Sequence, residues 1–579
     1  MVQVTLNQVQ KQYDVTICGA GLAGLTLARQ LKMQMPGLKI LLLDKIARPL
    51  PQAAFKVGES TVEVGAHYLS HVLKLTDYFE KNHYHKLGLR YFFSDASGSF
   101  EKRPEFGLSQ FPPVNSYQID RGILENDLRQ FNEEAGVELI ENCSVQDILL
   151  SNNDEFHQVI YTRKGDNTHQ TVTCRWVIDA MGSRRLLQKK LGLVKDNDEK
   201  FNAVWFRVNG CANVNDFVPK TVESWHQRVA NGIRYYSTNH LMGNGYWVWL
   251  IPLSSGNTSI GIVASEKFHP WLEFNSYGQA YKWLEKYEPV LASYLQDKKP
   301  LDFEGRRHYS YSSKQIFSQN RWACVGISGV FSDPFYSPGT DQIGFTNSVT
   351  TELIQLELDR KLTQQKVDDA NLYCLSYHEG VTRNIQSGYP FFGNALVMGT
   401  KLLWDNVSGW SSSGPMMFNS FFFDQEKKAK IQKVTGKFFL LSYQMQQLFK
   451  DWATKSNGQN SFDFLDYLSI PFVRKLYERN LQPNKTEQEL IDDHLASMET
   501  LEELAQVIFL IALEDTMPEA LSQLPSPLWL NAWSISLDAN KWSSNGLFRP
   551  KTQPRNLHNI TEQMRNVLLA NQRKAPIYC

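Results

Sequence analysis

Hydrophobic and polar positions in the first 45 residues follow the order strand, glycine-rich turn, helix, strand. Residues 13–18 form a short β-rich run, and after a turn at residues 19–24 apolar side chains recur at helical spacing until Pro36 and Gly37. These helical positions are Leu25, Ala28, Leu31 and Met35. A second apolar run follows at residues 40–43, so the pattern predicts a β-α-β unit.

The rest of the chain shows three further patterns. Asp120 can cap a second helix, which ends at Gly136 before a strand-like run. Residues 200–265 are rich in aromatic and β-branched side chains and predict antiparallel sheet. From about residue 350 helical periodicity dominates, and Thr486 with Glu489 forms a capping-box pattern ahead of a long helix. We therefore expect an α/β protein with an interleaved antiparallel sheet and a mainly helical C-terminal region.

Composition narrows the class of protein. The 579 residues contain 60 Lys plus Arg and 60 Asp plus Glu, and this neutral balance argues against general electrostatic binding to nucleic acid or anionic lipid. No segment approaches the ~18 apolar residues of a membrane-spanning helix, and the N-terminus lacks a signal-peptide pattern, so we expect a cytoplasmic protein without membrane insertion. Aromatic residues make up 12% of the chain, which fits either a large core or pockets for flat ligands.

The seven cysteines are scattered, with no C-x-x-C pair and no Cys/His cluster at metal-ligand spacing. Most of them lie in apolar, strand-like runs, where a cysteine is usually a small buried hydrophobic residue. We therefore expect neither a disulfide framework nor a metal site.

The turn at residues 19–24 carries the first candidate chemistry. Gly19, Gly21 and Gly24 fit G-x-G-x-x-G directly after a strand and at the start of a helix, the context in which this motif binds a dinucleotide pyrophosphate. Leu22 and Ala23 complete the turn, and Asp44 closes the second strand, where a carboxylate can hold ribose hydroxyls. The alternative is a tight turn that binds nothing.

Two more stretches resemble flavoprotein motifs. Residues 176–182, which include Asp179 and Gly182, resemble the second flavin-contacting strand and turn of the FAD monooxygenase-like superfamily. Residues 118–121 resemble the start of its preceding helix. The resemblance implies FAD as the cofactor. No second G-x-G-x-x-G follows a strand, so we expect FADH2 to come from a separate NAD(P)H flavin reductase.

Three further stretches resemble the flavin-dependent halogenases. Residues 247–252, WVWLIP, match the family signature W-x-W-x-I-P, and residues 331–339 match F-x-x-P-x-x-S-x-G. Lys86 follows residues 57–61, VGEST, at the distance where the family places its catalytic lysine. The motifs occur in the family's order within residues 13–347, whereas the remainder toward the C-terminus matches only loosely.

The resemblance implies a reaction for Lys86. In the family, reduced FAD reacts with O2, a halide ion (chloride or bromide) is oxidised to hypohalous acid, and a lysine presents electrophilic halogen to an aromatic carbon. An ammonium can polarise hypohalous acid and a desolvated amine can form a haloamine, so a lysine suits either route. The structural alternative is a solvated lysine on an edge strand.

Trp247 and Trp249 alternate with Val248 and Leu250, so both indoles face one side of a strand. One interpretation is a packed aromatic core strand. The interpretation that the resemblance implies is a wall between flavin and substrate, which prevents direct hydroxylation of the aromatic ring. The complete signature favours the wall.

Two positions depart from the family pattern. Tyr336 stands where family members acting on free tryptophan have a glutamate that assists the indole. The absence of that glutamate favours a phenolic or pyrrolic substrate, because such rings are activated by their own heteroatom. Pro338 lies within the halide-binding S-x-G and has no N–H to donate. Gly339 and Thr340 remain as candidate halide ligands.

The resemblance also implies flavin contacts beyond the first turn. The candidate positions are Asp44, Val57, Gly58, Glu59, Ser60, Asp179, Gly182, Gly326, Ile327 and Thr340. Most FAD hydroxylases of the superfamily have Gly-Asp where this chain has Gly326 and Ile327. The missing carboxylate counts against an ordinary hydroxylase and indicates an FAD held loosely enough to exchange.

We therefore expect an FAD-binding, doubly wound domain over residues 1–200 and 300–350, a substrate-side antiparallel sheet over residues 201–299 and a helical region over residues 351–579. The expected function is two-component halogenation of an electron-rich, phenol-like aromatic in secondary-metabolite biosynthesis. The substrate is a free small molecule or a tyrosyl group on a peptide or carrier protein. The aromatic residues of the C-terminal region are expected to pack its helices onto the flavin domain. The alternative is that they line a groove for a large or tethered aromatic. The alternatives are an FAD-dependent aromatic hydroxylase and a catalytically silent flavin-binding subunit of a biosynthetic complex.

Overall fold

The computed structural model describes residues 11–51, 56–94, 98–152, 155–166, 168–419, 425–458, 461–525, 528–549 and 556–569. The chain forms two compact units, each assembled from separate stretches of sequence. Unit 1 consists of residues 1–83, 119–198 and 309–382, and unit 2 of residues 84–118, 199–308 and 383–579.

Unit 1 is built on a sheet with the strand order β18-β19-β10-β1-β2-β7. These strands are β1 (Gln12–Cys18), β2 (Ile40–Leu43), β7 (Glu138–Ile140), β10 (Gln170–Asp179), β18 (Phe317–Ser318) and β19 (Trp322–Cys324). β1 pairs in parallel with β2 and β10, and β10 pairs in parallel with β19. All four residues of β2 are buried, as expected for a parallel strand covered on both faces.

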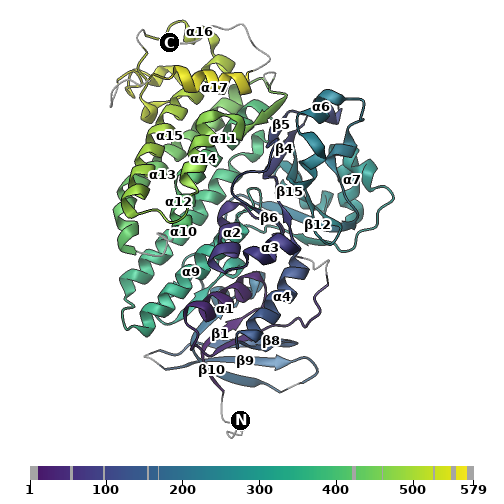
Figure 1. The fold of residues 1–579 in the computed structure, drawn as a ribbon, viewed down its shortest axis with the longest axis vertical. Coiled ribbons are helices and arrows are strands. Elements are labelled where there is room, and N and C mark those ends of the chain that lie inside the picture. Colours follow the sequence, from purple (N-terminus) through teal and green to yellow (C-terminus); the bar gives the residue numbers. More distant parts are fainter. Residues whose placement is uncertain are drawn as a thin grey trace. The chain divides into compact units, whose positions relative to one another are not determined.

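Antiparallel pairs and helices complete unit 1. β8 (Cys143–Leu149) and β9 (His157–Arg163) extend the sheet from β10, and β11 (Val194–Asp196) pairs with β17 (Tyr311–Ser313). The helices are α1 (Leu22–Gln34), α2 (Glu63–His67), the π-helix η1 (Tyr68–Val72), α3 (Thr76–Asn82), α4 (Arg121–Glu134), α5 (Leu186–Lys190) and α9 (Gly339–Leu358). α10 (Gln364–Gln386) continues from unit 1 into unit 2. α1 packs against α4 and α9 (Figure 1), and Asp120 caps α4 by accepting from Gly122 and Ile123, as predicted.

Unit 2 contains a second sheet, with the strand order β16-β12-β15-β14-β13-β4-β5-β20. Its strands are β4 (Leu89–Phe93), β5 (Glu105–Gly107), β12 (Phe201–Asn209), β13 (Thr238–Gly243), β14 (Tyr246–Pro252), β15 (Asn257–Ser265), β16 (Glu304–Arg306) and β20 (Phe464–Asp466). β12 to β15 pair antiparallel, as the composition of residues 200–265 predicts. One face of this sheet forms an apolar core with α7 (Tyr277–Tyr287) and α8 (Pro289–Leu295). A short pair, β3 (Tyr84–His85) and β6 (Tyr117–Gln118), lies outside the sheet.

The C-terminal part of unit 2 is helical. Its helices are α11 (Ala395–Ser411), α12 (Ser413–Phe418), α13 (Gln425–Lys455), α14 (Pro471–Asn480), α15 (Glu487–Thr516), α16 (Pro518–Leu521) and α17 (His558–Leu568), and α6 (Glu223–Gln227) lies earlier in the unit. α13 runs alongside α15 and α11 (Figure 1). The predicted capping box is present, since Thr486 accepts from the Glu489 N–H and the Glu489 carboxylate accepts from the Thr486 N–H. The α/β class with a helical C-terminal region is confirmed. Within the described ranges, none of the helices combines the length and the apolar character needed to span a bilayer.

Buried histidines give unit 1 a predictable pH dependence. Burial lowers the pKa of His67, His83, His157 and His378 to about 4. An unfolded histidine titrates near 6.5, so between pH ~6.5 and ~4 the unfolded chain binds more protons and each histidine removes up to about 1.4 kcal/mol of stability per pH unit of acidification. We expect the thermal midpoint to fall steeply as the pH is lowered from 7 to 5.

His378 provides the sharpest test of this expectation. Its Nε2 donates to the Tyr311 carbonyl at 3.2 Å, and its Nδ1 accepts from Gln342 at 3.0 Å, an arrangement that requires the neutral ring. His378→Gln should reduce the slope of midpoint against pH, whereas substitution of the exposed His169 by Gln should not. Equal slopes in all three proteins, measured by calorimetry, would contradict this account.

Candidate functional site

In the glycine turn between β1 and α1, two glycines pack closely against backbone atoms and a third faces open space. A Cβ on Gly19, whose φ is 110°, would lie 2.4 Å from the Ala180 carbonyl oxygen, and one on Gly24 would lie 2.0 Å from the Gly19 carbonyl oxygen. Around Gly21, by contrast, no atom of the described chain other than Gly21 and its two chain neighbours lies within 4 Å of a Cβ position. The N–H groups of Leu22 and Ala23 precede the first hydrogen bond of α1. They and the space at Gly21 are suited to an approaching anion.

Asp44 is held rigidly beside this turn. Its carboxylate accepts from Ala20 N–H at 2.6 Å and from Ile46 N–H at 2.7 Å, and lies 3.4 Å from the guanidinium of Arg129. Arg129, buried on α4, donates to the carbonyls of Ala20 and Ile46. Arg129 was not predicted from the sequence. The available signal was weak, namely a basic residue next to Leu128 on the apolar face of the helix.

A third part of the site lies at the ends of β10 and β19. Asp179 is buried and accepts from the N–H groups of Met181 and Leu187, and burial raises its pKa. Gly182 donates to the Ser328 hydroxyl at 2.7 Å. Asp179 therefore holds the turn that Gly19 approaches.

Gly326 and Ile327 lie against this turn. Gly326 has φ 56°, and a Cβ on it would lie 2.8 Å from the Ala23 Cβ. The Ile327 side chain lies 3.5 Å from the position of a Gly182 Cβ. The carboxyl ends of β1, β2, β10 and β19 thus meet at one edge of the sheet, which is where doubly wound folds bind ligands.

The two stretches of unit 1 that carry halogenase-like motifs, residues 57–61 and 331–339, also meet. Val57 accepts from Arg121 at 2.7 Å, Glu59 accepts from Ile119 N–H at 2.7 Å, and Gly58 has φ 92°. Ser337, itself at φ 56°, donates to the Ser60 hydroxyl at 3.1 Å. The VGEST stretch and the F-x-x-P-x-x-S-x-G stretch are therefore in direct contact.

The second of these stretches continues into α9. Pro338 is the N-cap, Gly339 is exposed and Thr340 is buried in the first turn. The N–H groups of Gly339 and Thr340 precede the first hydrogen bond of the helix, which runs from Gln342 to Pro338. Tyr336 is half-buried, with its ring 4.8 Å from that of Phe335.

Lys86 lies in unit 2, in the loop between β3 and β4, and is only 1% exposed. Its N–H donates to the Ser116 carbonyl at 2.8 Å, and the Leu87 N–H donates to the Tyr236 carbonyl at 2.9 Å. Gly88, at φ 76°, accepts from Thr238 N–H. Lys86 is therefore not a solvated surface lysine.

Aromatic rings from three segments of unit 2 gather around this loop, and the sequence analysis did not single them out. The Tyr84 ring lies 5.5 Å from that of Tyr236 and 6.2 Å from that of Tyr235, both edge-on. Phe111 adds a ring that is 44% exposed and lies 6.1 Å from that of Tyr236. These partly exposed rings give the surroundings of Lys86 an aromatic character.

Trp247 and Trp249 lie on one side of β14, opposite the face that builds the apolar core with Tyr246 and Val248. Both indoles are buried and donate, Trp247 to the Tyr389 hydroxyl at 2.9 Å and Trp249 to Ser259 at 3.2 Å. The two rings are thus fixed in orientation.

Comparisons with known proteins agree with this geometry. A family model described as an FAD binding domain matches residues 12–260. The flavin-dependent halogenase chlA of Dictyostelium discoideum is 26% identical over 441 residues, which cover 70% of each chain. A 1H-pyrrole-2-carbonyl peptidyl-carrier-protein chlorinase of Pseudomonas fluorescens is 24% identical over 409 residues, covering 66% of this chain and 82% of the relative. The chain is similar to the flavin-dependent halogenases.

Solved structures support the fold of the chain. Halogenase PltM aligns with a TM-score of 0.58 at 18% identity, over 88% of this chain and 97% of PltM. The flavin-dependent halogenase CmlS aligns with a TM-score of 0.54 at 18% identity, over 66% of each chain. These alignments show the fold, and the names of the curated relatives support an FAD-dependent halogenating oxidoreductase.

The residues of unit 1 fit FAD. The space at Gly21 and the first N–H groups of α1 suit the pyrophosphate, and Asp44 suits the ribose. The loop from Val57 to Ser60 and the segment Gly326–Ile327 would hold the remainder of the cofactor. Bound FAD supplies the redox chemistry that activates O2.

Proposed function

We propose that this halogenase works as a two-component enzyme, taking FADH2 from a separate NAD(P)H flavin reductase and using O2 with chloride or bromide. Its product is a halogenated, electron-rich aromatic of the phenol class, made in secondary-metabolite biosynthesis. The observation that carries the proposal is Lys86, a buried lysine in a loop whose backbone is hydrogen-bonded to Ser116 and Tyr236.

Lys86 is the proposed catalytic residue. Its burial limits the access of bulk water to the site. Hypohalous acid is then polarised by the Lys86 ammonium, or converted to a haloamine by the Lys86 amine, before the acid diffuses away. Trp247 and Trp249, whose orientations are fixed by hydrogen bonds, are the proposed wall between flavin and substrate. The alternative role of the two indoles is core packing.

Gly339 and Thr340 are the proposed halide ligands, through the free N–H groups at the start of α9. Asp341 lies in the same first turn, and its negative charge would oppose an anion. We therefore expect weak halide binding, with the rate still rising at high halide concentration.

A phenol-like substrate is favoured because Tyr336 supplies no carboxylate to assist an indole. Two relatives are named for pyrrole groups on carrier proteins, the chlorinase above and a brominase of Pseudoalteromonas luteoviolacea that is 25% identical over 335 residues. A carrier-bound or peptide-bound aromatic is therefore the second form of substrate to test.

The experiment combines the purified protein with FAD, bromide and NADH, with or without a flavin reductase. The aromatic is a free phenol, tyrosine, or a phenol or pyrrole loaded on a carrier protein. We expect brominated product only when the reductase is present. Product formation from NADH without the reductase would contradict the two-component proposal, and action on the pyrroles alone would contradict the phenol class.

A further inference from the structure

A network of fully buried charges lies next to the loop that carries Lys86. Arg90 on β4, Glu105 on β5 and Arg234 in the 3₁₀ segment Ala230–Tyr236 are each 0% exposed. Arg90 contacts one oxygen of Glu105, and Arg234 donates to both, at 2.8 and 3.0 Å. One carboxylate thus lies between two guanidinium groups.

Stability alone is a poor reason for this arrangement. Removing charges from water is costly, and apolar residues of similar volume often serve as well or better. Burial alone would raise the pKa of Glu105, but Arg90 and Arg234 outweigh it and hold the pKa below its ordinary value, so the carboxylate is ionised. Such a network favours one geometry over its alternatives, because a shift of any member leaves a buried charge unpaired.

The network fixes the segment that binds the backbone of Leu87. Arg90 donates from Nε to the Ser237 hydroxyl at 3.2 Å, and that hydroxyl donates to the Leu87 carbonyl at 3.4 Å. Ser237 N–H donates to the Arg234 carbonyl, and the Leu87 N–H donates to Tyr236. Both backbone groups of Leu87 are therefore held by a turn that Arg90 and Arg234 support.

The network also supports the segment that binds the backbone of Lys86. Arg90 donates from Nη2 to the Leu108 carbonyl. Gly107 leaves room for this contact, since a Cβ there would lie 2.8 Å from Arg90 Nη1. The chain continues from Leu108 to Ser116, whose carbonyl accepts from Lys86 N–H.

We propose that Arg90, Glu105 and Arg234 are positioning residues that hold the Lys86 loop in its reactive geometry. The inference rests on the proposed role of Lys86. Misplacement of a reacting group by about 1 Å can cost about 100-fold in rate. Loosening the network should therefore separate flavin oxidation from halogenation without loss of the fold.

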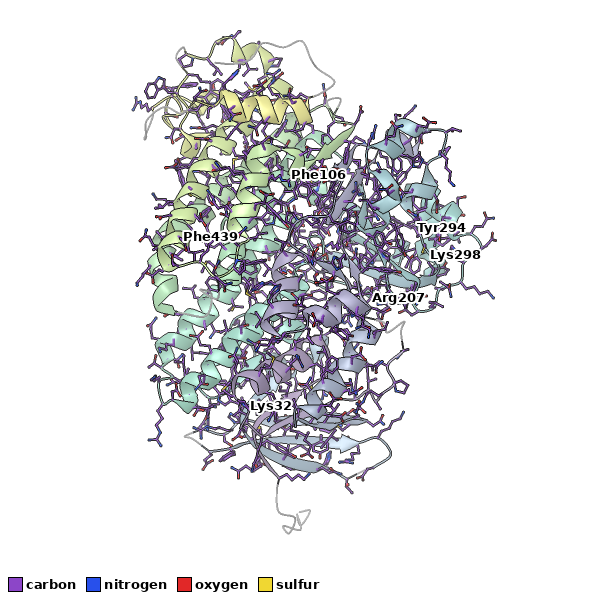
Figure 2. The ribbon with its side chains drawn as sticks, in the orientation of Figure 1. Lys32, Phe106, Arg207, Tyr294, Lys298 and Phe439 are labelled. Atoms are coloured by element: carbon purple, nitrogen blue, oxygen red, sulfur yellow. The ribbon has the colours of Figure 1, made fainter. Side chains whose placement is uncertain are left out.

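The test compares two buried carboxylates of unit 2. Glu105→Gln removes the central charge of the network. Asp302→Asn removes the partner of Arg207 on β12 and so breaks another buried ion pair. Figure 2 labels Arg207 and, on another strand of the same sheet, Phe106. The measurements are the FAD dissociation constant, the thermal midpoint, the KM for a phenol and the moles of brominated phenol formed per mole of FADH2 oxidised.

We expect Glu105→Gln to lower the product yield per FADH2 by about tenfold at saturating phenol, with unchanged FAD affinity and KM. Asp302→Asn should lower the thermal midpoint comparably but keep the yield within about twofold of wild type. Ser237→Ala, a milder change that only breaks the link from Arg90 to Leu87, should reduce the yield by about threefold even if Glu105→Gln does not fold. Equal yields in Glu105→Gln and Asp302→Asn, or a wild-type yield in Ser237→Ala, would overturn the inference. A Lys86→Ala protein that still halogenates would instead overturn the proposed function.

Discussion

Replacing Lys86 with alanine is expected to abolish halogenated product while FAD binding and FADH2 oxidation continue. Lys86 is buried in unit 2, whereas the turn, strand ends and loops that fit FAD belong to unit 1. The variant removes the group proposed to transfer halogen and none of the groups proposed to hold the cofactor. We expect a loss of about 100-fold or more in product formation, measured by mass spectrometry, with FADH2 oxidation followed by absorbance.

Two further variants make this result specific. Lys102 is exposed in the same unit, so Lys102→Ala should halogenate at the wild-type rate. Lys86→Arg keeps a positive donor that cannot become a free amine. Partial activity of Lys86→Arg would support polarisation of hypohalous acid, and no activity would support a haloamine. Normal halogenation by Lys86→Ala would contradict the assignment.

Replacing Gly21 with alanine is expected to weaken FAD binding without loss of the fold. Gly21 has φ −86°, which alanine adopts readily, and the described chain leaves the space around its Cβ position open. If the pyrophosphate occupies that space, the added methyl group meets the cofactor and the N–H groups of α1 can no longer approach it. We expect the dissociation constant for FAD to rise by about tenfold or more, measured by fluorescence titration.

Two other glycines separate cofactor binding from folding. Gly24→Ala places a methyl group 2.0 Å from the Gly19 carbonyl oxygen, so we expect a lower thermal midpoint even without FAD. Gly37 also has no close neighbour, but it lies beyond the end of α1, so Gly37→Ala should change neither property. Unchanged FAD affinity in Gly21→Ala would show that the turn does not bind the pyrophosphate.

Local signals predicted the elements that are proposed to hold the cofactor. In residues 13–43 an apolar run, a glycine turn and helical periodicity predicted β1, α1 and β2. These elements were predictable because the pattern of each one depends only on residues close together in the sequence. The helix caps at Asp120 and Thr486 were also predicted from nearby residues. The distance from the VGEST stretch predicted Lys86 as the candidate catalytic residue. The burial of its side chain was not predicted.

Long-range pairing could not be predicted in the same way. β4, β5 and β20 join the unit 2 sheet from outside residues 200–265, with β20 more than 350 residues after β5, and no periodicity encodes such partners. Arg90, Glu105 and Arg234 resemble surface charges in the sequence, since charged residues are seldom buried unless paired. Only the fold shows that they lie together beside Lys86.

Halogenation of an aromatic ring through Lys86 can be tested in one reaction. The most direct measurement is the mass spectrum of the product formed when wild-type protein and Lys86→Ala are each given chemically reduced FAD, O2, bromide and a phenol. We expect a brominated phenol, recognised by its paired bromine isotope peaks, from the wild type and none from the variant. A hydroxylated phenol without bromine from the wild type, or equal bromination by both proteins, would contradict it.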